Sequence, residues 1–162
     1  MRAKIIHEEV GGPLAGERTF ALIFETGEEV IAQLTEFATD RSLTACHFTA
    51  IGAFSDVTLG FFDWERKTYK KIPIHEQVEA ISLLGDIALQ DGKPTVHAHA
   101  VLGKSDGTAH GGHLMEGHVR PTLELILTEA PSYLQRKMDQ ESGLALIDIE
   151  TSNETTRSER AR

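Results

Sequence analysis

The chain has 162 residues, 40% of them hydrophobic and 25% charged, and this length fits one domain. The formal net charge of −9 disfavours direct binding to nucleic acid, which begins with Lys and Arg neutralising phosphates. A single cysteine, Cys46, excludes an internal disulfide. The apolar runs are far shorter than the roughly 20 residues that span a bilayer, so we expect a cytoplasmic protein without membrane contact.

The first part of the chain predicts strands around one main helix. Residues 4–7 and 18–25 are expected to form strands. Thr26 followed by Glu29 is a capping-box signature, and apolar residues at helical spacing follow it: Val30, Ile31, Leu34, Phe37 and Ala38. Residues 46–54 and 56–62 are predicted strands, and Gly52 and Gly60 inside them indicate bulges or close backbone approach.

The second part predicts further strands and a short helix. An extended run at residues 69–75 contains Pro73, and a longer strand is expected at 76–90. Asp91-Gly92 is a hairpin signal that leads into residues 95–102, so these two strands should pair antiparallel. The remaining expectations are a strand at 122–128, a short helix at 131–138 and a closing strand at 144–149.

Strands mostly follow one another, with few helices between them. We therefore predict an α+β fold, with a mainly antiparallel sheet of about eight strands, one main helix and one short helix. Residues 1–150 should form the domain, and the polar residues 151–162 a disordered tail.

Histidines gather in one stretch, where five of the eight lie between His97 and His118. Residues 95–102 alternate, so that His97 and His99 share the face opposite to the apolar residues. Residues two apart on a strand are roughly 6.6 Å apart, so two such imidazoles can converge on one ion. His113 is the candidate third ligand, because the glycines of residues 103–112 let the chain turn back toward the strand.

Three neutral imidazoles favour zinc, with iron, nickel or cobalt as alternatives, and they leave a coordination position open. The same histidines could instead make hydrogen bonds at a subunit contact. A cupin-like site is disfavoured, because Ala100-Val101-Leu102-Gly103 follows the pair where cupins add a glutamate. His110 and His118 are interpreted as surface histidines.

Carboxylates near the histidines could orient a ligand or act as a general base. Of these, Glu79 and Glu116 are the preferred candidates, since one lies on the neighbouring predicted strand and the other follows His113. In so acidic a chain, each carboxylate is more often a solvated surface charge. The set that we considered is Glu79, Asp86, Asp106, Glu116 and Glu124.

Over residues 4–150 the sequence resembles the PPC ("plants and prokaryotes conserved") domain. The matching segments are Ile51-Gly52-Ala53-Phe54, Leu59-Gly60-Phe61-Phe62-Asp63, Glu79 with Ser82-Leu83-Leu84-Gly85-Asp86-Ile87, His97-Ala98-His99-Ala100-Val101-Leu102-Gly103, and Gly111-Gly112-His113-Leu114 with Gly117. The resemblance implies an α+β homotrimer with a three-histidine metal site in some bacterial members, and DNA-binding AT-hooks joined to the domain in plants. It implies no particular enzymatic activity.

Two functions remain open from the sequence. The first is a homotrimeric module that binds a divalent metal through His97, His99 and His113, with DNA-associated regulation reached only through partners. The second is a metal-dependent hydrolase or lyase for an unknown small molecule, in which Glu79 or Glu116 transfers a proton.

Overall fold

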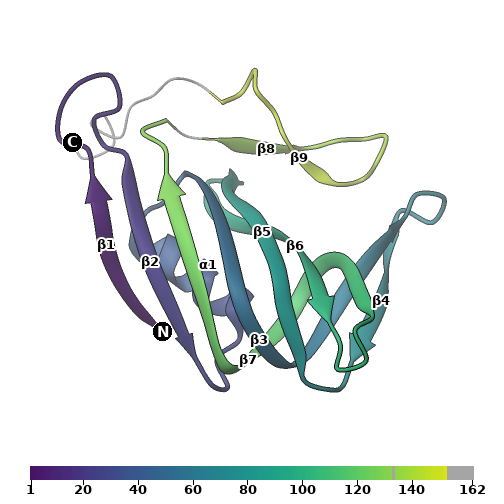
Figure 1. The fold of residues 1–162 in the computed structure, drawn as a ribbon. Coiled ribbons are helices and arrows are strands. Elements are labelled where there is room, and N and C mark those ends of the chain that lie inside the picture. The colour runs from purple at the N-terminus through teal and green to yellow at the C-terminus, as the bar shows by residue number, and fades with distance from the viewer. Residues whose placement is uncertain (133, 153–162) are drawn as a thin grey trace.

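Nine strands and one helix form the part of the chain that the computed structural model describes, residues 1–132 and 134–152. The strands are β1 (Arg2–Glu8), β2 (Arg18–Glu25), β3 (Ala45–Asp63), β4 (Thr68–Ile74), β5 (Val78–Gln90), β6 (Lys93–Gly103), β7 (Ala109–Glu129), β8 (Gln135–Met138) and β9 (Ala145–Ile147). The helix is α1 (Val30–Asp40), and it lies behind the sheet in Figure 1. No helix in these described ranges is long and apolar enough to cross a membrane.

One sheet contains all nine strands, in the order β1-β2-β7-β3-β5-β8-β9 along its main path. Every pairing is antiparallel except a short parallel contact between β5 and β8. Strand β4 pairs with the far end of β3, and β6 pairs with both β5 and β7. Because β3 also pairs with β5 and with β7, the four strands β3, β5, β6 and β7 close a ring at this end of the sheet. That ring brings β6 and β7 together.

Helix α1 covers the inner face of the sheet. Val30, Leu34, Phe37 and Ala38 are buried, as their helical spacing predicts. The ring of Phe37 packs edge-on against Phe20 of β2 with centroids 5.4 Å apart. This face forms the main core.

The start of α1 differs from the expected capping box. The N-cap residue is Glu29, whose carboxylate accepts hydrogen bonds from the backbone N–H groups of Ile31 and Ala32. Glu29 also accepts a bond from the N–H of Gly117 in β7, so the cap ties the helix to the sheet. Thr26 instead donates its hydroxyl to the carbonyl of Pro121.

The hairpin that precedes the histidines is confirmed. Gln90 and Lys93 are paired across it, and the two residues between them, Asp91 and Gly92, have φ of 51° and 76°. Positive φ at both central residues is typical of a type I′ turn, which suits the twist of paired strands. Strands β5 and β6 therefore run in register from this turn toward the site.

Two expectations for strands and helices need correction. The predicted strands at 46–54 and 56–62 are one continuous strand, β3, with register shifts near Gly52. Gly52 has φ of 152°, and a Cβ there would lie 2.4 Å from the carbonyl oxygen of Thr122, so glycine allows the bulge without breaking the strand. The predicted short helix at 131–138 is wrong, because Gln135–Met138 is strand β8. Residues 153–162 of the predicted tail lie outside the described residues.

Candidate metal centre

Strand β6 presents two histidines on one face. Ala98, Ala100 and Leu102 are buried against the core, whereas His97 is half-buried and His99 is exposed on the opposite face. The alternation of the sequence predicted this division. The two rings lie with centroids 5.2 Å apart.

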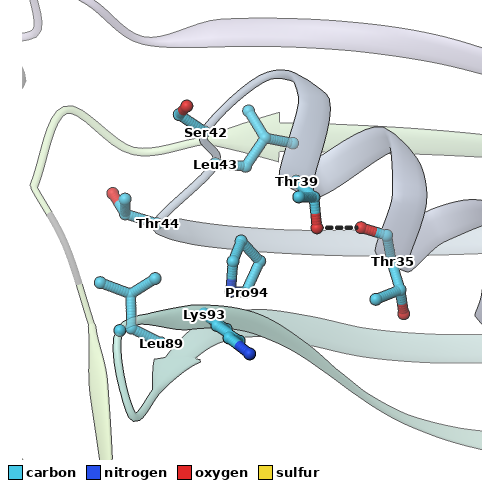
Figure 2. Close-up of a pocket in the computed structure, with 9 residues that line it drawn as sticks. Thr35, Thr39, Ser42, Leu43, Thr44, Leu89, Lys93 and Pro94 are labelled. Carbon is cyan, nitrogen blue, oxygen red and sulfur yellow. Dashed lines mark hydrogen bonds between the residues drawn. The ribbon is translucent and has the colours of Figure 1, made fainter.

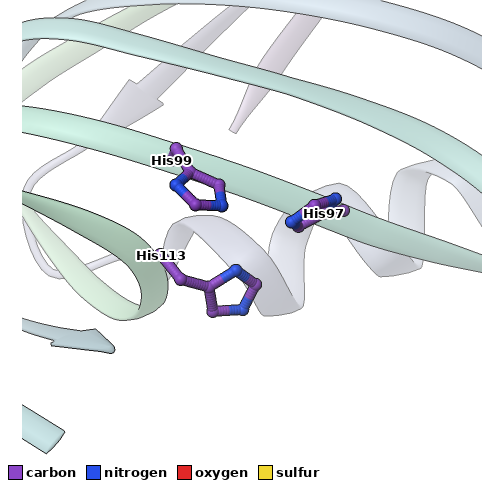
Figure 3. Close-up of side chains that lie close together, drawn as sticks. All are labelled: His97, His99 and His113. Atoms are coloured by element: carbon purple, nitrogen blue, oxygen red, sulfur yellow. The ribbon is translucent and has the colours of Figure 1, made fainter. Parts of the chain in front are cut away.

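His113 joins them from the neighbouring strand. It is the direct cross-strand partner of His99, and its ring centroid lies 5.1 Å from that of His97 and 5.3 Å from that of His99 (Figure 3). The sequence predicts that His113 comes from a glycine-rich loop. The structure places it in β7, which begins at Ala109, because Gly111 and Gly112 continue the ladder with β6.

These three side chains form a donor set that fits a divalent metal. One nitrogen from each ring lies within 4.8 Å of the others. The Nδ1 atom of His113 is buried and has no hydrogen-bond partner among the described residues. A buried polar atom without a partner is costly, and coordination to an ion would satisfy it.

Burial also keeps the rings in the form that binds metal. It lowers the pKa of His113 to about 4, and the neighbouring imidazoles His97 and His99 add to this effect. The pKa of His97 is lowered too, mainly by burial, although Asp86 acts in the opposite direction. Both rings are therefore neutral at neutral pH, and neutral imidazole is the metal-binding form.

Two residues that the sequence analysis did not connect with the site support it. The ring of Tyr69, from β4, stacks on the ring of His113 with centroids 4.8 Å apart. Arg136, from β8, contacts Asp86, whose carboxylate lies 3.7 Å from Nδ1 of His97. Both come from segments distant in sequence, and only the sheet topology brings them near the histidines.

The carboxylates considered from the sequence lie in different places. Asp86 faces His97, whereas Glu79 pairs with Gly103 further along β5, and Glu116 lies 3.9 Å from Nε2 of His118. Within the described residues, neither Glu79 nor Glu116 makes an ion pair with a histidine of the triad. Asp106 bonds to Thr108 in the turn before β7, and Glu124 lines the exposed outer face of the sheet.

The other two histidines of the stretch lie outside the triad. His118 bonds to Asp56 through Nδ1 at 2.8 Å, and His110 is exposed opposite Leu102. Neither belongs to the group of side chains that could hold a metal.

A separate hollow of about 540 Å³ lies between the end of α1 and the β5–β6 hairpin (Figure 2). The hydroxyls of Thr35 and Thr39 in its wall already donate to backbone carbonyls of the helix. Among the residues that the structure describes, no histidine or carboxylate lines it, so we assign it no chemistry.

Comparison with known proteins decides the family. The family model described as the Plants and Prokaryotes Conserved (PCC) domain matches residues 12–131. The chain belongs to this family. A search of curated proteins found no match.

Solved structures agree with this membership of the PCC family, also written PPC. A PPC protein from Pyrococcus horikoshii is 36% identical with a TM-score of 0.76, over 81% of this chain and 91% of that one. A metal-containing protein from Archaeoglobus fulgidus is 33% identical with a TM-score of 0.76, over 90% and 99%. A "putative DNA-binding protein" from Bacteroides thetaiotaomicron is 25% identical with a TM-score of 0.79, over 82% and 92%.

Proposed function

We propose that this PPC protein holds a divalent metal ion through His97, His99 and His113, as a module whose role depends on binding and assembly. The observation that carries the proposal is the convergence of three imidazoles around a buried, unpartnered Nδ1 of His113. A relative that is 33% identical is named a metal-containing protein, which supports the same conclusion.

Zinc is the favoured ion, because three imidazoles without a carboxylate or thiolate suit it, and iron, nickel and cobalt remain alternatives. An ion held by three protein ligands offers a further coordination position to an exogenous ligand. The residues of the chain would orient the ion and exclude water from one side of it, since His97 and His113 are half-buried.

We also propose that the protein assembles as a homotrimer through the outer face of the sheet. This face carries large apolar side chains that remain exposed in the single chain, among them Ile51 (62% exposed), Ile81 (58%), Leu84 (55%) and Ile126 (45%). They surround a shallow hollow of about 390 Å³. Contiguous exposed apolar surface of this kind is typical of a protein contact, and Leu84 lies directly across from His99, so the contact would border the metal site.

A DNA-associated role would require a partner. One relative is named a "putative DNA-binding protein", yet this chain has a net charge of −9. Phosphate binding by the isolated chain is therefore disfavoured.

The decisive experiment is metal analysis of five single alanine variants. After dialysis against a mild chelator, His97→Ala, His99→Ala and His113→Ala should lose most of the bound metal, because a two-ligand site binds far more weakly. His110→Ala and His118→Ala are matched controls and should retain it. Full retention by His97→Ala and His113→Ala would overturn the three-histidine assignment, and loss by His110→Ala would show that a different histidine is the ligand.

A further inference from the structure

Asp86 and His97 are direct cross-strand partners on β5 and β6. Their side chains share the outer face of the sheet, and Oδ2 of Asp86 lies 3.7 Å from Nδ1 of His97. This separation is longer than a hydrogen bond, but a carboxylate beside Nδ1 favours the tautomer that carries its proton on Nδ1, which leaves the lone pair on Nε2. Asp86 is thus placed to select which nitrogen of His97 is available to an ion.

The carboxylate of Asp86 is itself held from the other side. Nη2 of Arg136 contacts Oδ1 of Asp86, and Nη1 of Arg136 donates to the carbonyl of Ala145 at 3.3 Å. Arg136 is 8% exposed, so its guanidinium is buried and needs a charged partner. Asp86 therefore lies between a fixed guanidinium and the ring of His97, with one oxygen toward each.

The three candidate ligands are supported in different ways. Among the described residues, His97 is the one member of the triad with a carboxylate in ion-pair range. His113 is held by the stacked ring of Tyr69 instead. His99 is exposed, and its ring centroid lies 5.2 Å from that of His97 and 5.3 Å from that of His113. Removing the support of His97 should therefore affect one ligand and leave the other two in place.

We propose that Asp86 is a positioning residue, which orients His97 and fixes its Nδ1–H tautomer, and that Arg136 holds Asp86 in place. This inference rests on the proposed metal site and deepens it. It makes the β8–β9 hairpin part of the site's support, because Arg136 belongs to β8 and its guanidinium bonds to the first residue of β9. Carboxylates that bind the second nitrogen of a ligand histidine typically contribute 10–100-fold to metal affinity.

The test uses Co²⁺ as the probe, titrated into metal-free protein while its visible absorption is followed. Asp86→Asn should weaken Co²⁺ binding by about 10–100-fold, and the spectrum of the bound ion should change because His97 is no longer fixed. Asp86→Glu restores a carboxylate and should recover part of the affinity. Asp40→Asn, on the exposed end of α1, is the matched control and should bind Co²⁺ like the unaltered protein.

Arg136→Lys tests the second contact. Lysine keeps the positive charge but lacks the planar guanidinium group of arginine. The Co²⁺ affinity of this variant should therefore lie between those of the unaltered protein and Asp86→Asn. A direct readout needs no substitution: nitrogen shifts of the histidine rings in the metal-free protein should show His97 protonated on Nδ1. This measurement still decides the matter if Asp86→Asn does not fold.

The outcomes distinguish a failure of the proposed metal site from a failure of the proposed role of Asp86. If the unaltered protein binds no Co²⁺, the metal site fails and the inference fails with it. If the unaltered protein binds and Asp86→Asn binds equally well with the same spectrum, the site stands and the role of Asp86 is wrong. A loss of thermal stability in Asp86→Asn without a change in affinity would assign the ion pair with Arg136 to the fold alone. A His97 protonated on Nε2 would likewise overturn the inference.

Discussion

Tyr69 of β4 stacks on His113 of β7, with ring centroids 4.8 Å apart and ring planes inclined by 30°. The strand between them, β3, contributes Gly60, which is the cross-strand partner of His113. A Cβ at this position would lie 2.8 Å from Cδ1 of Tyr69 and 3.2 Å from Sδ of Met115. Glycine at position 60 is therefore what allows the tyrosine to reach across β3 and cover the histidine.

We expect Gly60→Ala to weaken metal binding by displacing Tyr69. The tyrosine ring must move to accommodate the added methyl group, and His113 then loses the contact that limits its rotation. Co²⁺ affinity of the folded variant measures the effect, and several-fold weaker binding is expected. Gly11→Ala is the control, because a Cβ there meets nothing within 4 Å and the residue does not have a left-handed φ. Tyr69→Phe should bind like the unaltered protein, and weaker binding by Tyr69→Phe than by Gly60→Ala would contradict a role through stacking.

Much of the fold could be predicted from local patterns. The alternation around His97 and His99, the turn at Asp91-Gly92 and the helical spacing that begins at Val30 are all local signals, and the structure confirms them. The prediction of a short helix at 131–138 was wrong, because β8 is stabilised by the contact of Arg136 with Asp86 and by parallel pairing with β5, neither of which is local.

The grouping of the three histidines was predictable, but the residues that support them were not. Three histidines in a short stretch indicate a shared ion, and the structure brings them together. Arg136 lies 50 positions from Asp86, and Tyr69 reaches His113 only because β4 and β7 both pair with β3. The four glycines before His113 predict a loop, yet Gly111 and Gly112 pair with β6 as strand residues.

Assembly is testable through one apolar side chain on the outer face of the sheet. Ile51→Asp should shift the protein from trimer to monomer, because a carboxylate at a buried contact would be desolvated without a partner. Light scattering coupled to size exclusion at micromolar concentration gives the mass directly. Val10→Asp is the control, since Val10 is 91% exposed in the loop before β2 and should leave the mass unchanged. A monomer mass for the unaltered protein would end the trimer proposal.

Direct DNA binding is expected to be absent or weak. AT-hooks of the plant proteins that carry this domain have an Arg-Gly-Arg-Pro core, which this sequence lacks, and its net charge of −9 repels phosphate. In an anisotropy titration with an A·T-rich duplex at physiological salt, the purified protein should show no sub-micromolar binding. Tight binding that weakens steeply with added salt would show that the chain contacts phosphates itself.

His118 and Asp56 form an ion pair between β7 and β3 that should make stability depend on pH. The hydrogen bond that His118 Nδ1 makes to Oδ1 of Asp56, at 2.8 Å, raises the pKa of His118. The pKa of Asp56 is lowered, first by the hydroxyl of Ser55 and then by His118. A raised histidine pKa stabilises the folded state fully below the unfolded value of about 6.5, and this contribution is lost as pH rises through the folded pKa. A lowered aspartate pKa stabilises it above about pH 4, and this contribution is lost as pH falls through the folded pKa.

The pair should therefore contribute most between about pH 4 and about pH 6.5. We expect His118→Gln to lower the free energy of unfolding more at pH 5.5 than at pH 8.5. The difference between the two pH values should be less than about 1 kcal/mol, because both side chains are more than a third exposed and solvent screens them. Urea unfolding of the metal-free protein at the two pH values measures the difference. His110→Gln, which removes an exposed histidine of the same strand, should show no such dependence. Equal losses for His118→Gln at both pH values would mean that the neutral ring holds the contact with Asp56 as well as the charged one does.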